Sequence, residues 1–137
     1  VDLNRNLPTK DWDPKAFTPR YPPGPHAGSE IENRDLVTFI RENKPAIMFS
    51  LHSWKPMLNV NGDCRPEADV IAALTGYVIE ETVGYPTPGC LGTYGVENKI
   101  PTLTYEIERG LSNSEILRVH VPAVLEALKV SERRFNK

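Results

Sequence analysis

The sequence lacks the features that mark two large classes of protein. It has no cluster of basic residues, and 16 lysines and arginines against 18 aspartates and glutamates give a net charge of −2. A nucleic-acid partner is therefore not expected. No apolar run approaches the roughly 20 residues that cross a bilayer, so we expect no membrane partner either.

Cysteine is also scarce. The two cysteines, Cys64 and Cys90, have no metal-type spacing, and one disulfide or two free thiols would fit them equally. The compartment therefore stays open, with a cytoplasmic location favoured over a secreted or periplasmic one.

Helical and strand patterns alternate along the chain. A length of 137 residues fits a single domain with one core. The patterns predict, in order, a helix at 30–43, a strand at 46–51, a short strand at 57–60, a helix from 66, a short helical segment at 89–98, a strand at 100–107 and a helix from 112. This order is typical of a layered α/β domain.

Two of the helices begin with a capping signal. Ser29 and Glu32, like Ser112 and Glu115, have the capping-box spacing, in which a hydroxyl and a carboxylate satisfy free amides at a helix start. Pro122 should kink or restart the last helix. The apolar stripes that we expect these helices to present to the core are Leu36, Val37, Phe39 and Ile40 in the first and Leu117, Val121, Val124, Leu125 and Leu128 in the last.

A long irregular segment precedes the first helix. Residues 9–28 are rich in proline and glycine, and loops of this length inside a domain are usually functional or disordered. The aromatic residues Trp12, Phe17 and Tyr21 indicate a loop that packs as a structured rim.

His52 follows the apolar run at 46–51, and Glu106 stands near the end of the strand at 100–107. The first run fits a strand buried on both faces of a parallel sheet. Ligands of open α/β sheets collect just outside the carboxyl ends of strands. His52 is accordingly placed either for chemistry or as a hydrogen-bonded cap of its strand.

Three interpretations fit this pair. In the first, His52 is a metal ligand and Glu106 is a general base. In the second, they serve a nucleophile, although no G-x-S-x-G elbow surrounds Ser53. In the third, both are structural and Glu106 pairs with an arginine such as Arg109. A catalytic zinc normally has three protein ligands, and no H-x-x-E or H-E-x-x-H is present, so spacing alone does not decide.

Four motifs occur in order over nearly the whole chain. They are Asp2-Leu3-Asn4-Arg5-Asn6, Ser29-Glu30-x-Glu32, Leu51-His52-Ser53-Trp54 and Leu103-Thr104-Tyr105-Glu106. Together they resemble the zinc carboxypeptidase family of metallopeptidases. The stretch 84–94 is similar to the bacterial murein peptide amidase branch, which cleaves the γ-D-glutamyl–diaminopimelate bond of cell-wall peptides. The resemblance implies a three-layer sandwich with a mixed, mostly parallel sheet flanked by helices.

The resemblance also implies roles for single residues. Asn4 and Arg5 match the pair that grips the terminal carboxylate of the substrate, a task that suits a guanidinium fork. His52 matches the third zinc ligand, and Glu106 matches the glutamate that activates the zinc-bound water. Tyr85 matches the mobile tyrosine over the substrate, one residue out of register. The implied cofactor is Zn²⁺, and the implied partner is a peptide with a free carboxylate.

The family's His-x-x-Glu pair and its oxyanion-stabilising arginine lie upstream of the motif with which this chain begins. We therefore expect residues 1–137 to be the C-terminal portion of one zinc peptidase domain, inactive alone and poor at holding zinc. A general metallocarboxypeptidase and a non-catalytic carboxylate- or peptide-binding module are the alternatives. A truncated sheet would have an open edge through which the chain could associate.

Overall fold

A computed structural model describes residues 1–15 and 18–136. No helix of these residues is long and apolar enough to span a membrane. In chain order the elements are the 3-10 helix η1 (Leu3–Arg5), α1 (Ile31–Asn43), β1 (Met48–Trp54), β2 (Met57–Asn61), α2 (Arg65–Thr75), β3 (Val78–Glu80), α3 (Leu91–Glu97), β4 (Thr102–Glu108), α4 (Asn113–Glu115), the π-helical turn η2 (Ile116–His120) and α5 (Val121–Phe135).

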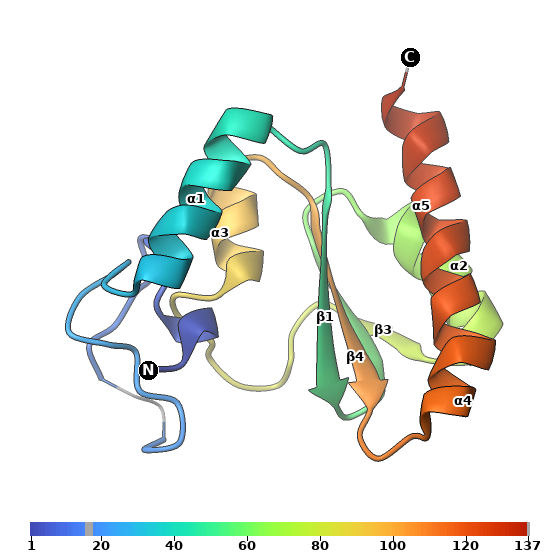
Figure 1. Ribbon diagram of the computed structural model, residues 1–137, viewed down its shortest axis with the longest axis horizontal. Coiled ribbons are helices and arrows are strands. Elements are labelled where there is room, and N and C mark those ends of the chain that lie inside the picture. The colour runs from blue at the N-terminus through green and yellow to red at the C-terminus, as the bar shows by residue number, and fades with distance from the viewer. Residues whose placement is uncertain (16–17, 137) are drawn as a thin grey trace.

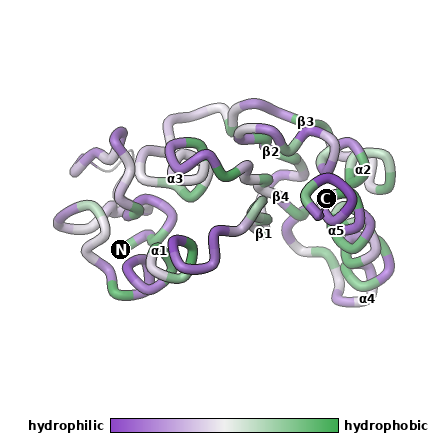
Figure 2. The backbone as a smooth tube through the Cα atoms, turned by 90° about the horizontal axis from the view of Figure 1, so that it is seen from above, coloured by the Kyte–Doolittle hydropathy of each residue, from purple (hydrophilic) through white to green (hydrophobic). Residues whose placement is uncertain are grey.

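The strands form one mixed sheet in the order β1-β4-β2-β3. β1 pairs with β4 and β2 with β3 in parallel, whereas β2 and β4 are antiparallel. Helices α1 and α3 lie on one side of the sheet, and α2 and α5 lie on the other (Figure 1). The view from above shows the same three layers (Figure 2). The predicted mixed, mostly parallel sheet flanked by helices is confirmed.

Each side of the sheet has its own core. Leu103 and Tyr105 of β4 pack with Ala123 and Ala127 of α5, and all four are completely buried. On the other side, Val37 and Ile40 of α1 belong to a second cluster, which also contains Leu7, Met48 and Tyr94.

β1 is an edge strand, which corrects the expectation of a strand buried on both faces. Among the described residues it pairs with β4 alone, and Leu51 is 57% exposed. His52 also lies inside β1 rather than after it. An apolar run indicates which side chains can be buried. It does not indicate whether a second strand lies beside them to bury them.

The start of α1 is built differently from the prediction. The Ser29–Glu32 capping box does not form, and Glu30 is the N-cap residue without a side-chain cap. The buried side chain of Asn6 serves the start of α1 in place of the capping box, because its Oδ1 accepts a hydrogen bond from the Glu30 amide at 3.1 Å. The capping box of Ser112 and Glu115 does form.

The expected apolar stripes are only partly buried. Val37 and Ile40 face the core, whereas Leu36 and Phe39 are exposed. α5 buries Ala123, Ala127 and Ser131 instead of its leucines, because small residues allow close packing against α2. The exposed members of the predicted stripe are Leu117, Val121, Leu125 and Leu128. The prediction that Pro122 restarts the helix holds, since the π-helical turn ends at His120 and α5 begins at Val121, with Pro122 in its first turn.

Candidate functional site

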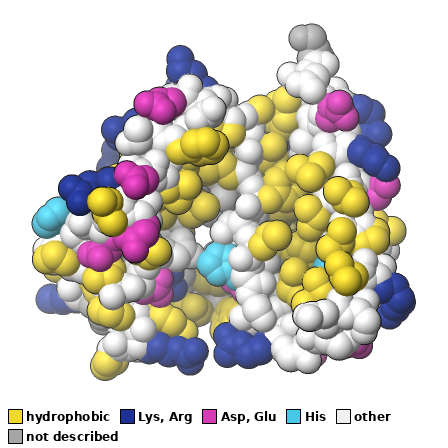
Figure 3. All heavy atoms as spheres, viewed as in Figure 1, with side chains coloured by type: hydrophobic (Ala, Val, Ile, Leu, Met, Phe, Trp, Pro, Cys, Tyr) yellow, Lys and Arg dark blue, Asp and Glu magenta, His cyan; other side chains and the backbone are white. Residues whose placement is uncertain are grey.

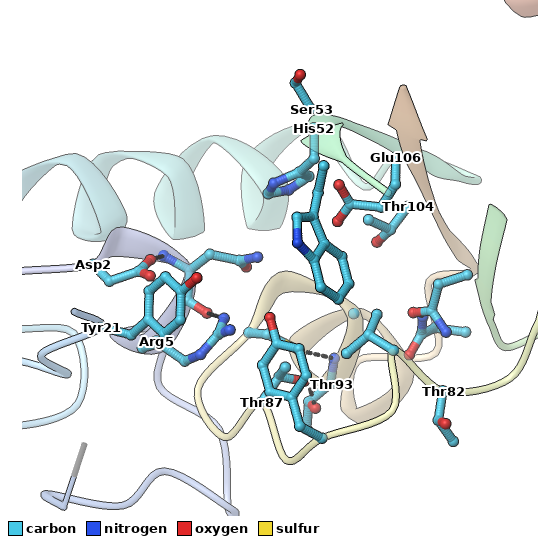
Figure 4. Close-up of a pocket in the computed structure, with 18 of the residues that line it drawn as sticks. Asp2, Arg5, Tyr21, His52, Ser53, Thr82, Thr87, Thr93, Thr104 and Glu106 are labelled. Carbon is cyan, nitrogen blue, oxygen red and sulfur yellow. Dashed lines mark hydrogen bonds between the residues drawn. The ribbon is translucent and has the colours of Figure 1, made fainter. Parts of the chain in front are cut away.

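The pairing of β1 with β4 sets His52 directly beside Glu106. Leu103 and Tyr105 point into the α2–α5 core, so their neighbours Thr104 and Glu106 point to the other face of the sheet. Figure 4 shows His52, Thr104 and Glu106 together at one side of a pocket, with Arg5 and Tyr21 on another side.

Glu106 is a buried carboxyl group with unused hydrogen-bonding capacity. It is 8% exposed, and its Oε2 atom has no hydrogen-bond partner among residues 1–15 and 18–136. Burial raises the pKa of Glu106 above its ordinary value, and the nearby charges of His52 and Arg109 oppose this shift. A raised pKa makes the carboxylate a stronger base than that of an exposed glutamate, which suits a group that accepts and returns a proton.

The imidazole of His52 is held by its own strand. Its Nε2 lies 2.9 Å from Oγ of Ser50, two residues earlier on the same face of β1. This hydrogen bond orients the ring and leaves Nδ1 for another partner. No group of three His, Cys, Asp or Glu side chains in the described part of the chain could hold a metal ion. Of the zinc ligands that the resemblance implies, His52 is the one that was assigned to these residues, and its role as a ligand stays a prediction.

Asn4 and Arg5 reach the pocket from η1. Oδ1 of Asn4 accepts the Leu91 amide at the start of α3, at 2.8 Å. The guanidinium of Arg5 donates to the Asn4 carbonyl and lies 5.3 Å from the centre of the Tyr21 ring. Its Nε is buried without a partner within the described residues. Arg5 is therefore fixed in position while retaining donors for a ligand.

The segment at 9–28 packs against the site, as the aromatic residues indicated. Besides the contact of Tyr21 with Arg5, Nε1 of Trp12 donates to the Pro23 carbonyl at 3.4 Å. The third aromatic of this prediction, Phe17, lies outside the described residues.

Tyr85 lies on a loop held against the chain start by Gly89. The Gly89 carbonyl accepts the Leu7 amide at 3.0 Å. A Cβ on Gly89 would lie 2.3 Å from the carbonyl oxygen of Arg5, and its φ of +74° favours glycine. Tyr85 makes an edge-to-face contact with Trp54, with the ring centres 5.8 Å apart.

All five residues predicted for the site, Asn4, Arg5, His52, Tyr85 and Glu106, line this single pocket of about 400 Å³. Their geometry is compatible with a shared site, while their individual roles stay predictions. The pocket also contains residues that the sequence did not single out for the site, among them Tyr21, Trp54, Asn59, Asn61 and Thr104.

Asn59 and Asn61 could have been found from strand alternation. They are two residues apart in the predicted strand at 57–60 and its following turn, so they share one face of β2. Nδ2 of Asn61 donates to Oδ1 of Asn59 at 2.7 Å.

Arg109 was expected only as an ion-pair partner of Glu106. It donates to the Ser53 carbonyl instead, and the two side chains form no ion pair in the described part of the chain.

Both cysteines are free thiols. Cys64 is completely buried, and Cys90 is the N-cap residue of α3, where its sulfur accepts a hydrogen bond from the Thr93 amide. The disulfide alternative does not occur in this structure.

The chain is a three-layer α/β domain with one polar pocket on one face of its sheet. No protein-family model matches it. Among curated proteins, murein peptide amidase A of Vibrio campbellii is 26% identical over an alignment of 141 residues. The match covers 94% of this chain and 56% of that protein.

Two solved structures share the fold. Murein-tripeptide amidase MpaA from Escherichia coli O157 has a TM-score of 0.78 and 23% identity, over 93% of this chain and 58% of that one. Bovine thrombin-activatable fibrinolysis inhibitor, in complex with tick carboxypeptidase inhibitor, has a TM-score of 0.72 and 20% identity, over 98% and 57%. The resemblance drawn from the four motifs is confirmed. The chain spans little more than half the length of each of these proteins.

Proposed function

We propose that this chain supplies the substrate-docking and general-base part of a hydrolase that cleaves an amide bond next to a terminal carboxylate. The observation that carries the proposal is the buried Glu106 carboxyl, which has a free oxygen and a raised pKa and faces the same pocket as His52 and Arg5. Similarity to murein peptide amidase A supports a cell-wall peptide as substrate.

Glu106 acts as the proton carrier in this proposal. Its carboxylate accepts a proton from the attacking water while the water oxygen bonds to the scissile carbonyl carbon. It then gives the proton to the amine nitrogen as the carbon–nitrogen bond breaks. Because burial raises its pKa, the carboxylate is a stronger base than an exposed glutamate, and its conjugate acid still donates readily.

Arg5 docks the carboxylate of the substrate. A guanidinium binds a carboxylate through paired, charge-assisted hydrogen bonds, and Arg5 is already held by the Asn4 carbonyl and Tyr21. Since Oδ1 of Asn4 accepts the Leu91 amide, Asn4 would contribute its NH₂ group. Tyr85 would cover the bound peptide from the loop that ends at Gly89.

His52 would provide one ligand to Zn²⁺, which supplies a Lewis acid when it is bound. The described residues do not fit a complete zinc site, because they offer one of the three protein ligands that a catalytic zinc normally has. The other ligands would come from a further part of the domain, so this chain by itself should neither hold zinc tightly nor hydrolyse peptides.

Two measurements test the proposal. Calorimetry with a tripeptide that ends in a γ-D-glutamyl–diaminopimelate unit should show binding to the chain that Arg5→Ala weakens at least about tenfold. The same tripeptide with its carboxylate amidated is the control.

In a longer protein that contains this chain, Glu106→Gln should abolish diaminopimelate release while zinc stays bound. Near-normal release would remove Glu106 from the mechanism, and preference for a plain dipeptide would indicate a general carboxypeptidase.

A further inference from the structure

A second arginine stands beside Arg5 on the same wall of the pocket. The guanidinium carbon of Arg5 lies 5.3 Å from the centre of the Tyr21 ring, and that of Arg20 lies 5.6 Å from the same centre. All three residues line the pocket, and Figure 4 shows Arg5 and Tyr21 next to each other there. Two like charges held around one ring form a site that attracts an anion.

No acidic side chain neutralises these two arginines. Asp2, Glu81 and Glu106 are the acidic residues that line the pocket. None of the ion pairs within residues 1–15 and 18–136 includes Arg5 or Arg20. Asp2 uses its Oδ1 to accept the Asn4 amide at 2.9 Å. Both guanidinium groups therefore keep their charge for a ligand.

The backbone around Arg20 is held in place. Oγ1 of Thr18 accepts the Arg20 amide at 3.3 Å, and the Thr18 carbonyl accepts the Tyr21 amide at 3.0 Å. The next residue, Pro22, accepts the Asp2 amide through its carbonyl at 2.8 Å. These bonds tie the segment to the start of η1, so the fold itself sets the spacing of the two arginines. Arg20 is exposed at the rim, and its side chain can turn toward a ligand.

We propose that Arg20 is a second carboxylate-binding residue of this pocket, and that the residue released by the hydrolase is a dicarboxylic amino acid. Arg5 binds the carboxylate next to the scissile amide, and Arg20 binds the carboxylate at the far end of the same residue. A planar guanidinium suits both tasks. The inference rests on the proposed function, because the docking role of Arg5 decides which carboxylate is left for Arg20.

The spacing of the two arginines agrees with a ligand of this length. Both guanidinium carbons are held to one ring centre, so they are no further apart than the sum of their distances to it. The two carboxylate carbons of an extended diaminopimelate are roughly 7–8 Å apart by standard bond lengths. This molecule can therefore bridge the two arginines. Lysine is the same molecule without the distal carboxylate, and it would leave Arg20 without a partner.

Arg109 offers a matched control for the effect of charge. Lys and Arg side chains lie on both sides of the lower end of the hollow between α1 and β1 (Figure 3). Arg109 lines the same pocket, but it follows β4 and donates to the Ser53 carbonyl at 2.9 Å. Its removal takes one positive charge from the pocket and leaves the contacts of Tyr21 with Arg5 and Arg20 in place.

Calorimetry with two peptides tests the role of Arg20. One is the tripeptide that ends in γ-D-glutamyl–diaminopimelate, and the other has lysine in place of diaminopimelate. The parent chain should bind the diaminopimelate peptide at least about fivefold more tightly than the lysine peptide. Arg20→Gln should make the two affinities equal and leave the lysine peptide within about twofold of its parent value. Arg109→Gln should keep the preference.

Arg5→Ala separates this inference from the proposed function, because it should weaken both peptides by the same factor. If both peptides bind through Arg5 with equal affinity, the role of Arg20 is overturned and the proposed function stands. The role of Arg20 is also overturned if the preference survives Arg20→Gln, or if Arg109→Gln removes it equally. If neither peptide binds, or if Arg5→Ala changes nothing, the docking step of the proposed function fails and the second docking residue fails with it.

Discussion

The two sides of the sheet differ in what they bury. The α2–α5 side is filled with apolar residues and closed at its far end by Arg134, which bonds the completely buried Glu67 and also Asp63. The other side has a smaller apolar cluster and a polar pocket, which is lined by the chain start, by loops and by side chains of β1, β2 and β4. β4 serves both, with Tyr105 on the packed side and Glu106 on the pocket side. Alternation along one strand thus separates residues for stability from residues for chemistry.

Breaking the ion pair on the packed side should have the largest effect. Arg134→Met leaves the carboxylate of Glu67 buried and uncompensated, which should lower the free energy of unfolding by about 3–5 kcal/mol. Urea denaturation measures this change. Arg65→Met is the matched control, because the Arg65–Asp69 pair is largely exposed and should contribute less than about 1 kcal/mol. Equal losses in the two variants would contradict the importance of the buried pair.

On the pocket side, the largest effect should come from Gly89→Ala. The added Cβ would meet the Arg5 carbonyl, and the positive φ adds strain, so we expect a loss of about 2–3 kcal/mol together with weaker binding of a carboxylate peptide. Urea denaturation and calorimetry measure the two effects. Gly84→Ala is the control, since its φ is +86° but nothing lies within 4 Å of its Cβ. It should cost only about 1 kcal/mol.

On the pocket side, the family motifs predicted more of the site than the periodicity of apolar side chains did. Periodicity and apolar runs located the strands of His52 and Glu106, because local side-chain spacing determines secondary structure. Only the resemblance linked these residues with Asn4 and Arg5. The hydrogen bond between Asn6 and the Glu30 amide joins residues 24 positions apart. The spacing of neighbouring residues in the sequence does not predict such long-range contacts.

Because local spacing does not predict long-range contacts, the predictions for the α5 stripe and for the burial of β1 were wrong. The predicted stripe of α5 was chosen by hydrophobicity, but the helix packs through Ala123 and Ala127, because the distance to α2 favours small side chains. The exposure of Leu51 depends on which strands are neighbours. Sheet order is a property of the whole fold, and the sequence of a single strand does not specify it.

The two sides should also respond to pH in opposite directions. On the packed side the Tyr105 hydroxyl and Nδ1 of His120 share a hydrogen bond. Burial lowers the pKa of His120 below its ordinary value of 6.5, against the opposing charge of Glu108. The unfolded chain therefore binds the proton more readily, and stability should fall as the pH drops below about 6.5. His120→Phe should remove this dependence. Urea denaturation between about pH 5 and 8 measures it, and an unchanged slope would exclude His120 as its source.

Glu106 should give the opposite dependence in the metal-free chain. Burial raises its pKa above the ordinary value of 4.5, so the folded state binds the proton more tightly than the unfolded state. The stabilisation is complete below pH 4.5 and is lost as the pH rises through the folded pKa. Glu106→Gln should therefore gain stability relative to the parent chain on going from about pH 4.5 to pH 7, and urea titrations at several pH values measure the difference. A constant difference would mean that the carboxyl is solvated like an exposed glutamate, and the argument for Glu106 as a general base would lose its physical cause.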